Sequence, residues 1–371
     1  MPTPWQRDLD EDAPKFEQWI RRQMPDATDV KVAGLVAPQS SGFSNETLLF
    51  DLSWQEGGEA RQEGMVVRIQ PTGYQVFPEY DLGLQFETMR LLGPTDVPVP
   101  NARWIELEDL SIFGAPFYVM DQVQGRVPTD QPPYHAGGWK TEITPAEREA
   151  IFLGGFDCMA KIHRLDVDAT GFGFLRRPQL GDTGLDQELA YYEKYFEWAA
   201  RGKEQPVIQA AHDWLVANKP KDEPESLLWG DARIGNIIFD GTTPAAVLDW
   251  EMVGVGSPEA DVGWQIFLDR HHSEGIETPR LEGFPSYEDT VAFYEERSGH
   301  RVRNLEYYQV FTGYRFGVIM MRIAQQMGHY EVMTPEQSRE FELNNTVTRL
   351  LAKIMELPPP GELAQKGSLS G

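Results

Sequence analysis

Short apolar runs, rather than long periodic ones, fill the first third of the chain. The first two runs flank PQSSGFSN, residues 38–45, whose Gly, Ser and Asn favour a tight turn. The third, GMVVRIQP, is rich in β-branched residues and ends at a proline, which is typical of a short buried strand. The expected strands are residues 30–36, 46–54, 64–71, 97–105 and 116–120.

Helical periodicity precedes this region and returns after it. At the N-terminus, Asp12 is expected to cap a helix that has Pro14 in its first turn. Beyond residue 145 amphipathic helices dominate, and a compact β segment at 227–251 interrupts them. A β-rich first third and a helical remainder predict an α+β protein with two lobes, joined near residues 121–125. The other expected helices are residues 80–92, 151–165, 185–201 and 305–328.

The composition is ordinary for a globular protein, but the charge is not. Of the 371 residues, 41% are hydrophobic and 25% are charged, and the net charge of −25 disfavours nucleic acids and anionic membranes as partners. A cationic substrate would be attracted, although a solvated acidic surface explains the charge more simply. The first residues lack the features of a signal peptide, and no apolar stretch reaches about 20 residues, so a cytoplasmic location is expected. Cys158 and His163 are expected to be core residues without chemistry.

The embedded β segment is expected to bring oxygen ligands together. Its apolar runs 237–239 and 245–248 flank DGTTP, whose Asp-Gly and Pro mark a turn, so an antiparallel hairpin is predicted. In such a hairpin Asn236 would lie beside Asp249, and their oxygens suit Mg²⁺. Asp231 precedes Asn236 by five positions, which is the spacing of a kinase catalytic loop. The simpler alternative is that both aspartates are turn and cap residues beside an ordinary hairpin.

Several motifs at ordered positions resemble those of one family. The run WGDARIGNIIFD…AVLDWEMVGVGSPEADVGW, preceded by SSGFSNET, GAPFYVMDQVQGRVP and MAKIHRLD, is similar to the aminoglycoside phosphotransferase family, which includes choline-kinase-like enzymes. The resemblance covers nearly the whole chain and implies a bilobal, protein-kinase-like fold that uses ATP and Mg²⁺. It implies an ATP-binding lobe over residues 1–121 and a catalytic, acceptor-binding lobe over 122–357. Residues 358–371, rich in Pro and Gly, are expected to be a disordered tail.

The resemblance also implies roles for residues around the hairpin. Asp231 resembles the catalytic aspartate, and Asn236 and Asp249 resemble the Mg²⁺ ligands. Asp261, in SPEADVGW, resembles the aspartate that braces the catalytic loop through backbone hydrogen bonds. Arg233 is placed either to stabilise the transferring phosphoryl group or to pair with a surface acid, and the sequence does not decide between the two.

The implied ATP site lies in the first lobe and at its boundary. SSGFSNET, residues 40–47, is similar to the loop over the ATP phosphates, and Arg68 stands where the family has a strand Lys or Arg. Residues 120–123 resemble the hinge that pairs with adenine. Without the resemblance, these features would be a hairpin turn, a surface arginine and a plain connector. The residues expected to contact ATP are Ser41, Gly42, Phe43, Ser44, Asn45, Arg68, Met120, Asp121 and Val123.

A few positions depart from the family's usual residues or stay ambiguous. Trp229 replaces a common histidine before Gly-Asp, which predicts altered packing with retained activity, and Arg68 replaces the commoner lysine. The partner of Arg68 is expected on the next helix, where charge favours Glu87 and alignment favours Gln85. Glu251 is either a carboxylate behind the metal or a solvated strand end.

Together these features predict an ATP-dependent enzyme that moves the γ-phosphoryl group to a hydroxyl of a small molecule. The alternative is a catalytically silent, nucleotide-binding pseudokinase-like regulator, although all three key residues are present. A protein acceptor is disfavoured because no APE-like segment follows DWE. An aminoglycoside, a hydroxylated acyl compound, an amino alcohol and a sugar all stay open as acceptors, and the sequence does not indicate the oligomeric state.

Overall fold

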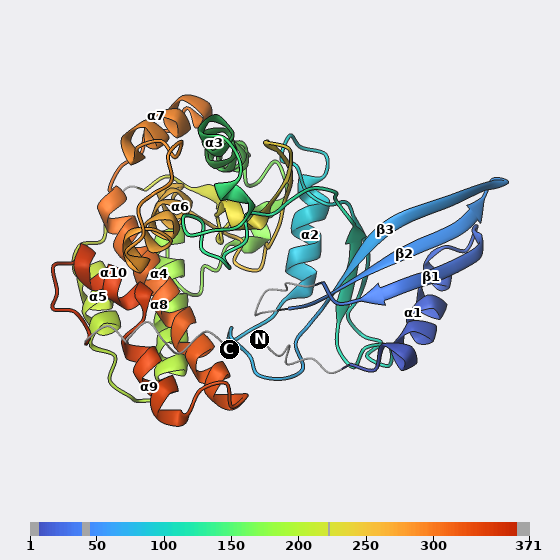
Figure 1. Ribbon diagram of the computed structural model, residues 1–371, viewed down its shortest axis with the longest axis horizontal. Coiled ribbons are helices and arrows are strands. Elements are labelled where there is room, and N and C mark those ends of the chain that lie inside the picture. Colours follow the sequence, from blue (N-terminus) through green and yellow to red (C-terminus); the bar gives the residue numbers. More distant parts are fainter. Residues whose placement is uncertain (1–6, 39–44, 222, 362–371) are drawn as a thin grey trace.

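An antiparallel sheet forms the N-terminal part of the protein. The computed structural model describes residues 7–38, 45–221 and 223–361, and its sheet has the order β1-β2-β3-β5-β4 (Figure 1). β3 is longer than the sequence predicts because its first half is polar and exposed, so apolar patterning does not mark it, yet it pairs with β2. The strands are β1 (Thr28–Val36), β2 (Glu46–Glu56), β3 (Glu59–Ile69), β4 (Ala102–Glu106) and β5 (Phe117–Asp121).

Two helices accompany this sheet. α1 (Leu9–Gln23) packs beside β1, and α2 (Leu82–Leu92) lies between the sheet and the helical part (Figure 1). The predicted cap of α1 is wrong. Asp8 caps the helix, because its carboxylate accepts hydrogen bonds from two backbone N–H groups of the first turn. Asp12 lies inside the helix, where it forms an ion pair with Arg7.

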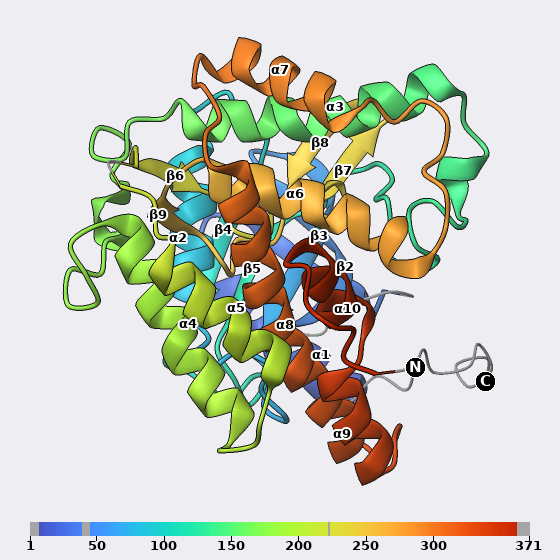
Figure 2. The same ribbon diagram turned by 90° about the vertical axis from the view of Figure 1, so that its left-hand side faces the viewer.

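Helices form most of the remaining chain, and α8 is their centre. α8 contacts α4, α5, α6, α9 and α10, and Figure 2 shows it running through the helical part. Within the described residues, no helix is long and apolar enough to cross a membrane. The α-helices are α3 (Pro145–His163), α4 (Gly184–Ala200), α5 (Pro206–Ala217), α6 (Glu259–His271), α7 (Tyr287–Ser298), α8 (Leu305–His329), α9 (Pro335–Leu343) and α10 (Thr346–Ile354). The 3₁₀ turns are η1 (Trp139–Thr141), η2 (Phe172–Leu175), η3 (Ile234–Asn236) and η4 (Glu274–Ile276).

The embedded β segment forms two small antiparallel pairs, and one of them is the predicted hairpin. β7 (Ile237–Asp240) pairs with β8 (Thr243–Val247), and β6 (Ser226–Leu228) pairs with β9 (Gly254–Gly256). The predicted register is wrong by one residue. Ile237 faces Val247, so Asn236 lies opposite Leu248, whose N–H donates to the Asn236 carbonyl at 2.8 Å. Asp249 follows that last pair, one residue outside the ladder.

The sheet separates two hydrophobic cores, and alternation along β3 and β5 decides which residues face each. Val67 and Val119 belong to the core shared with α1, whereas Val66 and Met120 belong to the core of the helical part. Because side chains alternate along a strand, Arg68 shares the face of Val66 and points toward the helical part. The sheet therefore directs this arginine toward the hairpin.

Candidate active site

The catalytic-loop candidate and the first metal-ligand candidate are in direct contact. η3 turns the chain between them, and the Nδ2 group of Asn236 donates to the Oδ2 of Asp231 at 2.6 Å and to its carbonyl at 3.1 Å. The other carboxylate oxygen of Asp231 accepts a hydrogen bond from the indole N–H of Trp264 at 2.8 Å. Since the amide nitrogen of Asn236 is used in this way, its amide oxygen is the atom left for a cation.

Asp249 brings a buried carboxylate to the same place. Its backbone has φ +62°, a left-handed conformation that turns the chain sharply where β8 ends. Burial raises the pKa of the Asp249 carboxyl, the guanidinium of Arg68 opposes that rise, and the negative charge of Asp231 adds to it. Within the described part of the chain, the Oδ1 atom of Asp249 is buried without a hydrogen-bond partner. A buried carboxylate oxygen that accepts no hydrogen bond is costly, so this atom suits a bound cation.

The two oxygen donors of Asn236 and Asp249 suit Mg²⁺ better than they suit a metal ion that needs a complete set of protein ligands. Among the described residues, no group of three His, Cys, Asp or Glu side chains is arranged to hold a metal ion. Mg²⁺ usually takes one or two protein oxygens and completes its shell with water and substrate phosphates. Asn236 and Asp249 offer two such oxygens.

Arg68 lies against the hairpin and has partners that the sequence did not indicate. Its Nη1 donates to the hydroxyl of Thr47 at 3.0 Å, and its Nη2 lies 3.8 Å from the Oδ1 of Asp249. The interpretation of Glu87 as its partner is wrong, because Glu87 pairs with Arg90 on the exposed surface of α2.

Gln85, the other candidate, joins the surroundings of Arg68 only indirectly. Its side-chain oxygen accepts a hydrogen bond from the hydroxyl of Tyr118 at 3.3 Å, and Tyr118 lies opposite Arg68 in the sheet. Burial raises the pKa of Tyr118 to about 12, so its hydroxyl stays protonated as a donor. The acidic neighbour of Arg68 is therefore Asp249 rather than a residue of α2.

A fully buried carboxylate holds the loop that carries Asp231. The Oδ2 of Asp261 accepts a hydrogen bond from the N–H of Trp229 at 2.7 Å, and its Oδ1 accepts one from Gly230 at 2.9 Å. A ring nitrogen of His163 lies 3.0 Å from Asp261, and the other ring nitrogen lies 2.7 Å from the hydroxyl of Tyr294. His163 therefore supports Asp261 from behind, which agrees with a role outside the chemistry.

Trp229 and Gly230 tie this loop to the strand that leads to Asp249. The indole N–H of Trp229 donates to the carbonyl of Leu248 at 2.8 Å, a bond that links the loop to the residue before Asp249. Gly230 has φ +90°, and a Cβ atom there would lie 1.9 Å from the carbonyl oxygen of Met252. Only glycine fits that backbone at that approach.

Arg233 pairs with two carboxylates at once. Its Nε lies 3.1 Å from the Oδ2 of Asp231, and its Nη1 lies 2.5 Å from the Oδ2 of Asp130. The hydroxyl of Tyr134 lies 3.5 Å from the same Nη1 and accepts from the N–H of Gly235 at 3.2 Å. Arg233 therefore pairs with a half-exposed acid and also adjoins Asp231, while its action on a transferring phosphoryl group stays a prediction.

Some residues of the site escaped the sequence reasoning. Trp264 lies three residues after Asp261, one helical turn along α6, and that spacing is the signal that could have placed it near Asp231. Asp130 and Tyr134 belong to an irregular segment without a motif, so no spacing marks them.

The structure describes only part of the set of residues predicted to contact ATP. Ser41, Gly42, Phe43 and Ser44 lie outside the described residues. Asn45 donates to the carboxylate of Glu251 at 3.3 Å, so the chain before β2 is tied to the segment after Asp249. Glu251 is therefore in contact with the site rather than at a solvated strand end.

At the predicted hinge, two backbone donors are already used. The N–H of Asp121 donates to the carbonyl of Asn101 at 3.0 Å, and the N–H of Gln122 donates to the carbonyl of Gly64 at 3.0 Å. The side chain of Asp121 forms an ion pair with Arg103. These two N–H groups are therefore bonded within the protein, and the pairing of this segment with adenine stays a prediction.

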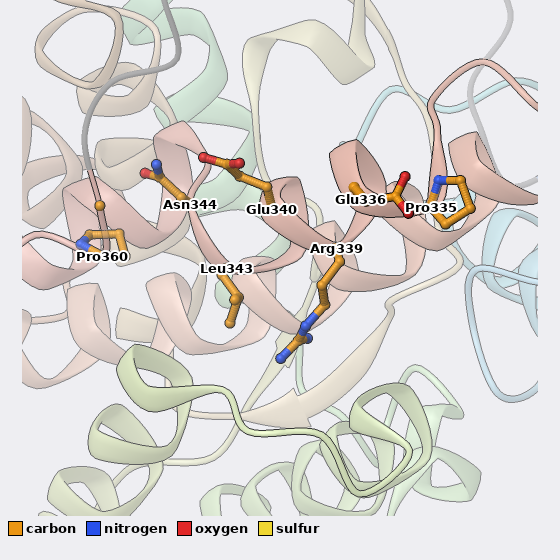
Figure 3. A pocket seen from close by; sticks show the side chains of 8 residues that line it. Pro335, Glu336, Arg339, Glu340, Leu343, Asn344 and Pro360 are labelled. Atoms are coloured by element: carbon orange, nitrogen blue, oxygen red, sulfur yellow. The ribbon is translucent and has the colours of Figure 1, made fainter.

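An open hollow lies elsewhere, on the C-terminal helices. Its volume is about 550 Å³, and Figure 3 shows Arg339 and Leu343 of α9 among the side chains that line it. Arg339 is already paired with Glu342 and with the carbonyl of Glu204. None of the lining residues belongs to the cluster around Asp231, so this hollow does not bear on the chemistry.

Comparison with known proteins identifies the family of this chain. Residues 36–294 match the sequence model of the phosphotransferase enzyme family. The chain belongs to this family. The resemblance to phosphotransferases, which the sequence motifs indicated, is therefore confirmed.

Curated relatives of this phosphotransferase-family chain are longer proteins with another name. It is 31% identical over 258 residues to acyl-CoA dehydrogenase family member 11 of Gallus gallus, which covers 68% of this chain and 30% of that protein. The Homo sapiens protein of the same name is 27% identical over 277 residues, covering 70% of this chain and 32% of that protein. The chain thus spans about a third of the length of these relatives.

Solved structures of the family share the fold. A Ralstonia eutropha protein, provisionally named an aminoglycoside phosphotransferase, superposes with a TM-score of 0.67 at 23% identity, covering 93% of this chain and 98% of that one. An aminoglycoside phosphotransferase in a ternary complex with AMP-PNP and hygromycin B gives 0.54 at 15% identity, covering 92% and 97%. At these identities the likeness shows the fold alone, and the predicted α+β, kinase-like fold is confirmed.

Proposed function

We propose that this chain is an ATP-dependent phosphotransferase that phosphorylates a hydroxyl of a small molecule. The observation that carries the proposal is the cluster of Asp231, Asn236 and Asp249, which lie together beside the cation of Arg68. Membership of the phosphotransferase enzyme family supports the reaction class. The side chain of Asp231 is 14% exposed, so its carboxylate is not closed off from the surface.

In this proposal Asp231 orients the acceptor hydroxyl and takes its proton. The acceptor oxygen forms a bond to the γ-phosphorus, the bond from that phosphorus to the β–γ bridging oxygen breaks, and ADP leaves. Trp264 and Asn236 each donate to the carboxylate of Asp231, which fixes its direction toward the acceptor. Arg233 lies next to the same carboxylate, where its charge would oppose the negative charge on the transferring group.

The remaining residues would bind and orient the nucleotide. Asn236 and Asp249 would hold Mg²⁺, which would supply positive charge to offset the negative charge of the phosphates. Arg68, already directed at the hairpin by the sheet, would contact the phosphates. We assign residues 1–121 to the ATP-binding lobe and 122–357 to the catalytic, acceptor-binding lobe, with adenine at the backbone of residues 121–123.

The names of the relatives widen the choice of acceptors. Two curated relatives are named acyl-CoA dehydrogenases, and one solved neighbour holds hygromycin B. We therefore infer two acceptor classes for testing, hydroxylated acyl thioesters and aminoglycosides. The dehydrogenase activity in the relatives' name is said of proteins of which this chain matches about a third, so it is not proposed for this chain.

The test is transfer of labelled γ-phosphate from ATP to a panel of hydroxyl compounds in the presence of Mg²⁺. Asp231→Asn is expected to lower turnover by about 100-fold or more, because the acceptor loses its proton acceptor. Asp240→Asn is the matched control, since Asp240 ends β7 of the same hairpin but is exposed. Turnover of Asp231→Asn equal to that of wild type would refute the assignment, and ATP binding without transfer to any acceptor would favour the silent regulator.

A further inference from the structure

A permanently charged side chain is buried directly behind the catalytic loop. Arg315 lies in the middle of α8 and is 1% exposed. Its guanidinium carbon is 4.8 Å from the ring centres of both Tyr192 and Trp264 and 5.3 Å from that of Phe311. Such an aromatic cage would readily accept an apolar side chain. An arginine keeps its charge there, and burying that charge costs free energy that an apolar residue would not cost.

The guanidinium is incompletely paired within the described part of the chain. Its Nε and Nη1 atoms have no hydrogen-bond partner there, and its Nη2 donates to the carbonyl of Gly230 at 3.4 Å. Burial lowers the pKa of Arg315, but Tyr192 and the negative charges of Glu188 and Asp261 outweigh that effect, so the pKa is raised. The one backbone group that Arg315 reaches is therefore the carbonyl immediately before Asp231.

Arg315 and Asp261 hold Gly230 from opposite sides. Asp261, on α6, accepts from the N–H of Gly230 at 2.9 Å, while Arg315, on α8, donates to its carbonyl. Both bonds lie in a dry interior, where hydrogen bonds are stronger than in water. Gly230, the residue before Asp231, is thus held at both its N–H and its carbonyl, at the φ of +90° that only glycine adopts readily.

A second route from Arg315 reaches the carboxylate itself. The guanidinium lies over the face of the Trp264 indole, an arrangement with favourable cation–π energy. The N–H at the edge of that indole donates to the Oδ1 of Asp231 at 2.8 Å. Since the cation holds the plane of the ring, it also holds the direction of the N–H bond.

We propose that Arg315 is a positioning residue for the phosphotransfer reaction, acting on Asp231 through the Gly230 peptide and the Trp264 indole. The proposal rests on the proposed function, in which Asp231 is the residue that meets the acceptor. Arg315 contacts neither the predicted phosphate-binding residues nor the adenine hinge in the described structure. Its loss should therefore lower kcat and leave the KM for ATP nearly unchanged.

The experiment compares Arg315→Met and Arg315→Lys with a matched control on the same helix. Arg322→Met is that control, because Arg322 lies seven residues further along α8, is 3% exposed and is also stacked between two rings, those of Trp198 and Tyr74. Arg322 donates to the carbonyl of Gln75 at 2.6 Å and has no recorded contact with the catalytic loop within the described residues.

Arg315→Met is expected to lower kcat by about 10- to 100-fold, because small displacements of a reacting group have effects of that size, with the KM for ATP within threefold of wild type. Arg315→Lys should recover part of kcat, since it restores a cation over the indole. Arg322→Met should lower the melting temperature without lowering kcat per folded molecule. A kcat for Arg315→Met within threefold of wild type, or an equal loss in Arg322→Met, would overturn the proposal.

A spectroscopic measurement tests the role of Arg315 independently of the phosphate-transfer assay. The indole ¹⁵N–¹H signal of Trp264, assigned by its disappearance in Trp264→Phe, should shift in Arg315→Met and stay in place in Arg322→Met. If wild-type protein transfers no phosphate to any acceptor, the proposed function fails, and this signal still decides whether Arg315 positions the indole. An unshifted signal in Arg315→Met would remove the second route.

Discussion

Replacing Asp261 with asparagine tests how firmly the catalytic loop is held. The carboxylate is completely buried and uses both oxygens, one for Gly230 and one for Trp229 and His163. Asparagine has the same shape but a single oxygen. Whichever way the amide turns, its NH₂ group faces at least one N–H that previously had an acceptor.

The expected cost follows from these contacts. Losing a hydrogen bond to a charged acceptor costs about 1.5–3 kcal/mol, and leaving a buried N–H unsatisfied costs about 1–3 kcal/mol. Together the free energy of unfolding should fall by about 3 to 5 kcal/mol. At about 1.3 °C per kcal/mol for a chain of 371 residues, the melting temperature should fall by roughly 4 to 6 °C. The displaced loop should also lower kcat by about 100-fold.

The assay pairs thermal unfolding with turnover, and Asp269→Asn provides the control. Asp269 lies on the same helix, is equally buried, and binds His135, Tyr287 and Arg280 instead of the loop. Its replacement should cost similar stability but leave kcat per folded molecule unchanged. Equal kcat values for wild type and Asp261→Asn, or equal losses in both variants, would show that Asp261 does not brace the loop.

Two further predictions concern the ionisation of Lys140 and the hydrogen bond of Gln85. Burial lowers the pKa of Lys140 to about 8, whereas the unfolded chain keeps that proton up to about 10.5, so the unfolded state binds more protons between these values. Between pH 8 and 10.5 the free energy of unfolding of wild type should therefore rise, relative to that of Lys140→Met, by about 1.4 kcal/mol per pH unit. Urea unfolding at several pH values measures this difference. A difference that stays constant with pH would contradict the burial argument. Gln85→Leu should lower the free energy of unfolding by about 1–3 kcal/mol, because it removes the side-chain oxygen that accepts from the Tyr118 hydroxyl. The control Glu87→Gln should cause no measurable change, because Glu87 pairs with Arg90 on the surface. Similar losses in both variants would restore Glu87 as a partner of Arg68.

Local patterns in the sequence determined much of the fold and the centre of the site. The hairpin could be predicted because Asp-Gly and Pro between two apolar runs specify a turn within a few residues. Asp231 and Asn236 could be singled out by their spacing, and the structure adds that the turn η3 brings their side chains into contact. Helix periodicity located α2, α4 and α8 to within two residues, but it gave no range for α5, α6, α7, α9 or α10. Polar residues at the ends of elements hid the true start of α1 and of β3.

Only the tertiary structure decided which distant groups meet. The acidic neighbour of Arg68 comes from the hairpin rather than from α2, because side-chain alternation in the sheet turns Arg68 toward the helical part. The second partner of Arg233 comes from an irregular segment, and Arg315 reaches the loop from the middle of α8. Apolar periodicity specifies which face of an element is buried, but it carries no information about which element supplies the opposing face. Which residues of distant elements contact each other is therefore set by the packing of the whole chain.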